Sequence, residues 1–113
     1  MSAPTLSVVL PARNAVATID RAARSILAST LRELELIVID DGSTDDTTEV
    51  IRQIDDPRLR LIQQEPGGVC AAANRGTNEA RAPVIARMDA DDFSHPKRLE
   101  KQLDLLRQSN VDM

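Results

Sequence analysis

The hydrophobic positions of this chain follow two alternating patterns. Short, mainly apolar runs at residues 6–10, 34–39, 59–62 and 83–87 predict four strands. Between them, apolar side chains recur three and four positions apart, as at residues 19–27, which is the spacing of an amphipathic helix. Strands and helices that alternate with short connections predict an α/β fold, in which helices cover both faces of a mainly parallel sheet.

Residues at the predicted boundaries carry start and stop signals. Pro11 is expected to end the first strand. Ser43 and Asp46 have the spacing of a capping box, which predicts that a helix starts there. Pro96 suits the first turn of the last helix, because its missing N–H would be unpaired at that position. The third helix would carry small side chains on one face and so could lie close to the sheet: Val69, Ala72, Ala73, Gly76 and Ala80.

Three carboxylates stand together directly after the fourth predicted strand. Asp89, Asp91 and Asp92 would repel one another strongly. A divalent cation relieves that repulsion, and hard oxygen ligands suit Mg²⁺ or Mn²⁺. If the segment is extended, Asp89 and Asp91 point to the same side, and Asp92 points to the other side, where it could cap the following helix. A solvated acidic loop is the alternative that these residues leave open.

Polar clusters follow three of the predicted strands, at residues 11–14, 40–43 and 89–92. In open α/β sheets, ligands bind beyond the carboxyl ends of the strands, so these clusters are expected to share one crevice. The chain has neither a Gly-x-Gly-x-x-Gly after the first strand nor a Walker-type Gly-Lys-Ser/Thr, which disfavours dinucleotide and P-loop binding. Within the second cluster, Asp40 is expected to tie down its own loop rather than a ligand.

The composition restricts the class of protein further. The chain has 113 residues, 42% hydrophobic and 28% charged, which suits a single soluble domain. Its net charge of −4 argues against general nucleic-acid binding, because phosphate backbones need a basic face. Cys70 is the only cysteine, so the sequence offers no disulfide framework and a reducing cytoplasm fits best. Cys70 itself is expected to be a small buried side chain. No apolar run reaches the ~20 residues of a membrane span, and no signal-peptide pattern opens the chain.

Four segments, in this order, resemble the motifs of family-two glycosyltransferases: Ser7–Asn14, Val38–Thr47, Gly68–Gly76 and Met88–Asp92. The resemblance covers nearly the whole chain. It implies the glycosyltransferase A-type fold, a Rossmann-like three-layer α/β/α sandwich of the nucleotide-diphospho-sugar transferase type. It also implies transfer of a sugar from a nucleotide-diphospho-sugar, with a UDP-sugar favoured, to an unknown acceptor with the help of Mn²⁺ or Mg²⁺.

The resemblance assigns roles to residues of the first two motifs. Pro11, Ala12, Arg13 and Asn14 would line the nucleoside pocket, mainly through their backbone. Asp41 matches the acid that hydrogen-bonds the base, commonly uracil. Family members often place tyrosine where Arg13 stands. The guanidinium could stack on the base in its place or instead meet a phosphate.

The last motif would serve the diphosphate and the metal. Asp89 and Ala90 would lie along the ribose and diphosphate, and Asp91, together with Asp89, would bind the metal as a DxD motif. There the cation would neutralise charge on the departing nucleoside diphosphate. Many relatives carry arginine where Ala73 sits, so that cation is either missing here or supplied by Arg75.

The resemblance makes residues 1–113 the nucleotide-sugar-binding part of a glycosyltransferase domain, without the acceptor-binding half. The catalytic base of the family is an aspartate of that half, and no position here matches it. We therefore expect the base beyond Met113 and expect the fragment alone to be inactive. Residues 110–113 resemble the opening of a fifth strand. The fourth strand would then present an exposed edge, which invites pairing with a second copy.

Two other classes of protein stay open. A non-catalytic nucleotide-binding or interaction module could carry the same motifs. A receiver-like phosphoacceptor domain also has paired acids after a strand, but it needs a phosphorylatable aspartate after its third strand, where this chain has Gln63, Gln64 and Glu65.

Overall fold

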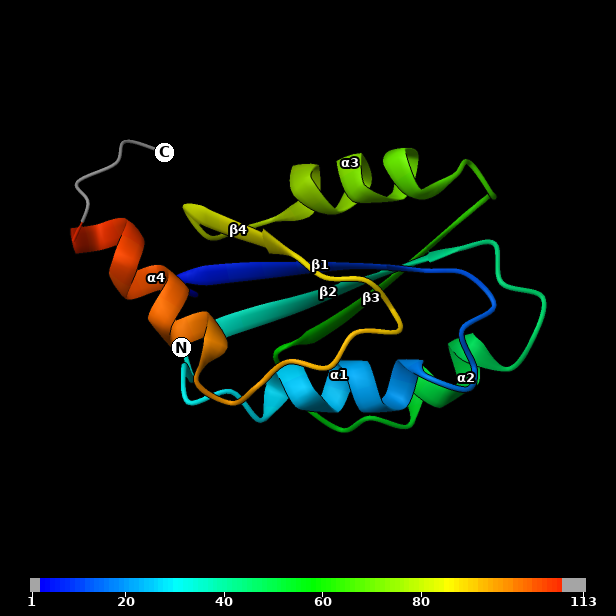
Figure 1. Cartoon of the computed structure of the whole chain (residues 1–113). Coiled ribbons are helices and arrows are strands. Elements are labelled where there is room, and N and C mark those ends of the chain that lie inside the picture. The colour runs from blue at the N-terminus through cyan, green and yellow to red at the C-terminus, as the bar shows by residue number, and fades with distance from the viewer. Residues whose placement is uncertain (1–2, 109–113) are drawn as a thin grey trace.

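The computed structural model describes residues 3–108, and strands alternate with helices along them (Figure 1). The elements are β1 (Leu6–Ala12), α1 (Ile19–Leu27), β2 (Leu34–Asp41), α2 (Thr47–Arg52), β3 (Leu59–Gln64), α3 (Val69–Glu79), β4 (Val84–Arg87) and α4 (Arg98–Gln108). This order confirms the α/β class predicted from the hydrophobic pattern. Within residues 3–108, no helix has the length and apolar character needed to span a membrane.

The four strands form one parallel sheet in the order β3-β2-β1-β4. Val8 of β1 lies beside Leu36 of β2 and, on its other side, beside Ala86 of β4. Every residue of β1 and β2 is buried, whereas the edge strands β3 and β4 are only partly covered. Inner strands of a parallel sheet are covered on both faces, which explains why most of their side chains are apolar.

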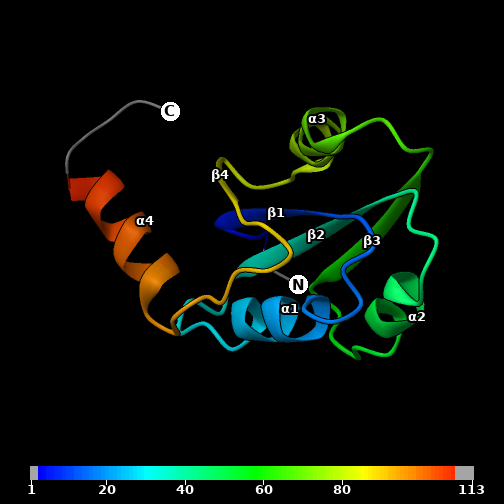
Figure 2. The same cartoon turned by 45° about the vertical axis from the view of Figure 1, so that its right-hand side comes forward.

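Helices cover the two faces of the sheet unequally (Figures 1 and 2). α1 and α2 lie against one face and enclose the larger hydrophobic core, to which Ile19 and Ile51 contribute. α3 lies over the other face and closes a smaller core of Ile37, Ile39 and Ala72. The predicted three-layer α/β/α sandwich is therefore confirmed.

α4 lies beside the β4 edge of the sheet (Figure 1). Leu99 and Leu103 of this helix are buried, and an apolar groove of about 480 Å³ runs between α4 and β4. Within residues 3–108, no strand pairs with the outer edge of β4, where Ile85 is 42% exposed. Residues 110–113, where the sequence predicts the opening of a fifth strand, lie outside the described residues. The exposed edge and dimer formation through it therefore stay predictions.

A glycine lets α3 lie close to the sheet. A Cβ atom at Gly76 would stand 2.3 Å from Cγ1 of Val9 in β1, far inside van der Waals contact. Ala72, about one turn earlier, is buried against the same face. The predicted face of small residues is confirmed at these two positions, whereas Val69 at the start of the helix is 54% exposed.

Pro11 does not end β1, so that prediction is wrong. The strand continues to Ala12, and Pro11 is paired in register with Ile39 of β2. β4 pairs with β1 only as far as Val9, whose carbonyl oxygen accepts a hydrogen bond from the N–H of Met88. Backbone groups two residues apart point to the same side of a strand. The N–H that proline lacks would therefore face a position where β4 has already ended, and no ladder bond is lost.

Two smaller predictions are also wrong. α2 begins at Thr47, and the side chain of its N-cap residue Asp46 makes no capping hydrogen bond, so Ser43 and Asp46 do not form a capping box. The N–H of Thr47 donates to Asp45 Oδ1 at 2.9 Å. The Ser43 hydroxyl oxygen instead accepts a hydrogen bond from the loop after β1. Cys70 is exposed rather than buried. It precedes the sheet-facing Ala72 by two residues, which turns it about 200° around the helix.

Candidate functional site

The loops that follow β1, β2 and β4 leave the sheet at the same end, because all of its strands are parallel (Figure 1). A cavity of about 260 Å³ lies at this end, between the loop after β1 and the start of α3. The structure thus brings the first two polar clusters of the sequence together. The lining residues are Pro11, Ala12, Arg13, Asp41, Gly68, Val69 and Ala72.

Asp41 ends β2 and is only 3% exposed, and its carboxylate holds the glycine turn that precedes α3. Its Oδ1 accepts hydrogen bonds from Gln64 Nε2 at 2.8 Å and from the N–H of Gly67 at 2.9 Å. Its Oδ2 accepts one from the N–H of Gly68 at 2.9 Å. The bonds from Gln64 and the two glycines, with Arg13 nearby, hold the pKa of Asp41 below its ordinary value despite burial. Asp41 is therefore an anion that fixes one wall of the cavity.

The loop after β2 is held from within. Asp40 is 2% exposed, and its Oδ1 accepts a hydrogen bond from the N–H of Ser43 at 3.1 Å, while Oδ2 accepts one from the Thr48 hydroxyl. Gly42 has a φ of 72°, and a Cβ atom there would stand 2.5 Å from Cδ of Pro66. Only glycine suits both the backbone and the close contact. The prediction that Asp40 ties down its own loop is confirmed.

Asn14 does not line the cavity, because its side chain faces the loop after β2. Its Oδ1 accepts hydrogen bonds from the N–H of Thr44 at 2.7 Å, the Thr44 hydroxyl at 3.2 Å and the N–H of Asp45 at 3.3 Å. Its own N–H donates to Ser43 Oγ at 3.0 Å. The sequence grouped residues 11–14 as one lining, and the structure separates Asn14 from the other three.

The acidic stretch after β4 forms a tight turn. The N–H of Asp92 donates to the carbonyl oxygen of Asp89 at 3.1 Å, and the N–H of Asp89 donates to Asp92 Oδ2 at 3.3 Å. An extended backbone, which would have placed Asp89 and Asp91 on one side, is therefore not present. The expectation that Asp92 caps the next helix is wrong, because Asp92 closes this turn and α4 begins only at Arg98.

The residues after the acidic turn are attached to α1. The N–H of Ser94 donates to Ser25 Oγ at 2.9 Å, and the Arg21 guanidinium lies 4.8 Å from the ring centroid of Phe93. The sequence reasoning missed both attachments. Phe93 is the single aromatic residue of the chain, and that was the only signal available.

Asp89 and Asp91 are exposed on this turn, and Ala90 between them is half-buried against the larger core. Within residues 3–108, neither carboxylate has a hydrogen-bond or ion-pair partner. These three residues do not line the cavity next to Asp41. The third polar cluster thus lies at the same end of the sheet, outside the cavity that joins the other two.

The sequence profile of Glycosyl transferase family 2 matches residues 7–113. The chain belongs to this family. The chondroitin synthase of Escherichia coli is 37% identical over 106 residues, which are 92% of this chain and 16% of that protein. The succinoglycan biosynthesis protein ExoU of Rhizobium meliloti is 42% identical over 106 residues, 90% of this chain and 31% of that protein. This family 2 chain thus spans less than a third of either relative.

Solved structures share the fold of this family 2 chain. TarS 1-349 of S. aureus, in complex with UDP, has a TM-score of 0.85 at 23% identity over 92% of this chain and 32% of that chain. The mannosyltransferase PcManGT from Pyrobaculum calidifontis, in complex with GDP-Man and Mn²⁺, has a TM-score of 0.82 at 26% identity over 94% of this chain and 33% of that chain. The glycosyltransferase A-type fold expected from the sequence is therefore confirmed.

The acidic turn of this family 2 chain fits a metal that is shared with a ligand. In the part of the chain that the structure describes, no group of three acidic, histidine or cysteine side chains could hold a metal by itself. Mg²⁺, however, usually binds one or two carboxylates and completes its shell with substrate phosphates and water. Asp89 and Asp91 offer exposed oxygen ligands of this kind.

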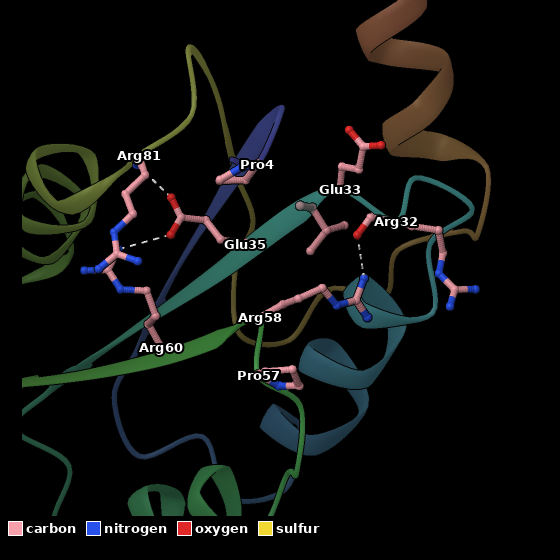
Figure 3. A pocket seen from close by; sticks show the side chains of 9 residues that line it. Pro4, Arg32, Glu33, Glu35, Pro57, Arg58, Arg60 and Arg81 are labelled. Atoms are coloured by element: carbon pink, nitrogen blue, oxygen red, sulfur yellow. Dashed lines mark hydrogen bonds and ion pairs between the residues drawn. The ribbon is translucent and has the colours of Figure 1, made fainter. Parts of the chain in front are cut away.

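A second cavity, of about 300 Å³, lies at the opposite end of the sheet, near the starts of β2 and β3 (Figure 3). Arginines dominate its lining, but two of them are paired with acids. Arg58 lies 2.9 Å from Asp56, and Arg60 lies 3.1 Å from Glu35. Glu35 is 5% exposed and also accepts a hydrogen bond from the Ser7 hydroxyl. These contacts join β1, β2 and β3, so we interpret this cavity as a structural junction.

Proposed function

We propose that this chain binds the nucleoside diphosphate of an activated sugar, as the donor-binding part of a family 2 glycosyltransferase. The observation that carries this function is the cavity at the carboxyl end of the sheet, which Asp41 and residues 11–13 line together. Ligands of open α/β sheets bind at that end. TarS in complex with UDP-GlcNAc and PcManGT with GDP-Man support the assignment, because both proteins share this fold.

Asp41 selects the base in this scheme. Each oxygen of an ionised carboxylate can accept about two hydrogen bonds. Oδ1 already accepts two, from Gln64 and Gly67, whereas Oδ2 accepts one, from Gly68. The open position on Oδ2 can take one further N–H. Uracil offers its N3–H and guanine its N1–H. The corresponding ring nitrogen of cytosine carries no hydrogen, and its lone pair would lie close to the carboxylate if the adjacent 4-amino group donated instead. We therefore favour UDP-sugars, place GDP-sugars second and disfavour CDP-sugars.

The diphosphate would lie between Arg13 and the acidic turn. Arg13 is exposed at the cavity, where its guanidinium can form a charge-assisted pair with a phosphate. Asp89 and Asp91 would hold Mg²⁺ or Mn²⁺ together with phosphate oxygens, and Ala90 fixes the turn against the core. When bound, the metal supplies Lewis-acid stabilisation of the leaving nucleoside diphosphate.

We propose further that residues 1–113 bind the donor without transferring its sugar. General-base catalysis typically contributes ~10²–10⁴-fold, and we place the base outside this chain. An uncharacterized glycosyltransferase of Haemophilus influenzae supports this division, because all of this chain covers only 46% of that protein. Release of UDP from a panel of UDP-sugars, with simple sugar acceptors and Mn²⁺, should stay at background. Transfer at ordinary enzymatic rates would contradict this assignment.

A non-catalytic nucleotide-binding module is the second candidate. It predicts the same binding by this chain, and no transfer by any longer protein that contains it. The receiver-like alternative fails on topology. The sheet order here is β3-β2-β1-β4, whereas receivers have the flavodoxin-like order 2-1-3-4-5.

Nuclear magnetic resonance titration of the isotope-labelled chain tests the binding, because it detects weak complexes residue by residue. With UDP and Mg²⁺, we expect shifts at residues 11–13, at Asp41 and at the glycine turn 67–68. When Mn²⁺ replaces Mg²⁺, paramagnetic broadening should reach residues 89–91 only after UDP is added. GDP should bind and CDP should not. An unchanged spectrum with both UDP and GDP, or equal binding of CDP, would overturn the assignment.

A further inference from the structure

Asn14 has an unusual backbone conformation. Among residues 3–108 it is the single non-glycine residue with positive φ, at 49°. Asparagine visits this left-handed region more readily than most residues. Such a conformation persists only where the surrounding structure holds it in place. At this point it turns the chain after β1 back toward the loop after β2.

The two loops exchange hydrogen bonds around this residue. The N–H of Asn14 donates to Ser43 Oγ at 3.0 Å, and the N–H of Ala15 donates to Thr47 Oγ1 at 2.9 Å. In the opposite direction, Asn14 Oδ1 accepts the N–H and the hydroxyl of Thr44 and the N–H of Asp45. One side-chain oxygen therefore serves backbone donors about thirty positions away in the sequence.

We propose that Asn14 is a positioning residue, which latches the loop after β1 to the loop after β2 and so shapes the nucleotide cavity without touching the nucleotide. This role presupposes the proposed nucleotide binding and deepens it. Arg13, the next residue in the chain, lines the cavity, and Asp41 lies at the base of the latched loop after β2. Release of the latch would free the loop after β1, which begins at Arg13, to move relative to the Asp41 wall, which Gln64 and the glycine turn hold in place.

The atoms of the amide distinguish a latch from a ligand contact. The protein engages Oδ1 as an acceptor, and within residues 3–108 the donor Nδ2 has no protein partner. A contact with phosphate or ribose would use Nδ2, because phosphate oxygens are acceptors only. Asn14→Asp keeps the acceptor and removes the donor. Asn14→Ala removes both, and Asn14→Gly removes both while keeping the freedom to adopt positive φ.

Hydrogen exchange in the absence of any nucleotide tests the latch by itself. Loss of the acceptor should speed exchange at the amides of Thr44 and Asp45 by ~tenfold or more in Asn14→Ala, because both bonds are then missing. Asn14→Asp should exchange at the parental rate. Asn14→Gly should resemble Asn14→Ala. Parental exchange in Asn14→Ala or in Asn14→Gly would overturn the latch, and a dispersed amide spectrum of each variant checks that it is folded.

Titration with UDP and Mg²⁺ then tests the consequence for binding. Apparent affinity falls with the fraction of molecules in the competent state, so Asn14→Ala should weaken UDP by ~threefold or more. Asn14→Asp should bind like the parent. The titrations are run at about 0.5 M NaCl, where the Debye length is about 4 Å. At that ionic strength, the charge added in Asn14→Asp has little effect on a ligand that it does not touch.

Hydrogen exchange and UDP titration together distinguish a failure of the positioning role from a failure of the proposed nucleotide binding. If Asn14→Asp keeps slow exchange at Thr44 and Asp45 but loses UDP affinity like Asn14→Ala, then Nδ2 contacts the ligand and the positioning role is refuted. If the parent itself does not bind UDP, the proposed function fails, while the exchange data still decide whether Asn14 joins the two loops.

Discussion

Replacing Asp41 by asparagine should destabilise the fold as well as the nucleotide complex. The carboxylate accepts hydrogen bonds from Gln64, Gly67 and Gly68, at a position that is 3% exposed. Asparagine keeps one oxygen and replaces the other by an NH₂ group. At least one of the three donors then faces another donor. The turn before α3 thus loses part of its attachment to β2.

The cost follows from the burial of these groups. A buried donor that loses its partner costs ~1–3 kcal/mol, so we expect the free energy of unfolding to fall by about 2 kcal/mol. For a domain of ~100 residues, each kcal/mol lowers Tm by roughly 4 °C or more. Asp41→Asn should therefore lower Tm by about 8 °C. Its affinity for UDP should fall as well, because the acceptor position on Oδ2 is lost or reversed.

Thermal and urea unfolding of Asp41→Asn beside Asp91→Asn measures this effect. Both substitutions remove one negative charge from a chain of net charge −4, so the two variants are matched in charge. Asp91 is exposed, and its carboxylate has no partner within residues 3–108. Asp91→Asn should therefore unfold within ~0.5 kcal/mol of the parent. Equal stability of the two variants would refute the reasoning, because it would mean that water replaces the lost bonds at no cost.

Acid unfolding gives an independent measure of the same bonds. The pKa of Asp41 is lowered in the folded chain, chiefly by the hydrogen bond from Gln64. Its stabilising contribution is therefore complete above the ordinary pKa of an aspartate and is lost as the pH falls through the lower folded value. Asp41→Asn should be less stable than the parent at neutral pH and should lose less stability in acid. Parallel curves for the two proteins would contradict the assigned direction.

Four further predictions follow from single residues. Gly76→Ala places a methyl group 2.3 Å from Val9 Cγ1 and should cost ~1–3 kcal/mol in urea unfolding. Burial alone would raise the pKa of Glu35, but its hydrogen bonds hold the pKa in the folded chain below the ordinary value. The free energy of unfolding should therefore fall as the pH drops through the folded pKa, and Glu35→Gln should flatten the acid unfolding curve. Asp91→Ala should abolish Mn²⁺-dependent UDP binding in titrations without changing Tm. Ile85→Lys should prevent the concentration-dependent dimers that the free β4 edge predicts in sedimentation velocity.

The core elements were predictable because their physics is local. β1 and β2 are covered on both faces, so most of their positions must be apolar. The mainly apolar runs at 6–10 and 34–39 therefore indicated strands. The exact end of β1 was not predictable from Pro11. Whether proline breaks a strand depends on what lies beside its missing N–H, and the early end of β4 decides that. The length of a neighbouring strand is not visible in the sequence of β1.

The gathering of the site was predictable, and the direction of its side chains was not. Parallel strands place their carboxyl ends together, which brought Asp41 and Arg13 to one cavity. Asn14 belongs to the same motif as Arg13, yet its side chain faces away from the cavity to serve Thr44 and Asp45. Two loops with many exposed backbone donors compete for each short polar side chain, and no spacing rule says which donor wins.

The acidic turn shows the same limit for the metal ligands. Period-two spacing fixes the side of a carboxylate only while the backbone is extended. Here Asp92 accepts the N–H of Asp89 and closes a turn instead of capping α4. The chain directly after that turn is held by Ser94, whose N–H donates to Ser25 on α1, far away in the sequence. The position of the acidic turn relative to the sheet is thus set partly by α1. The motif specifies which acids are available, and packing between distant elements specifies where their oxygens point.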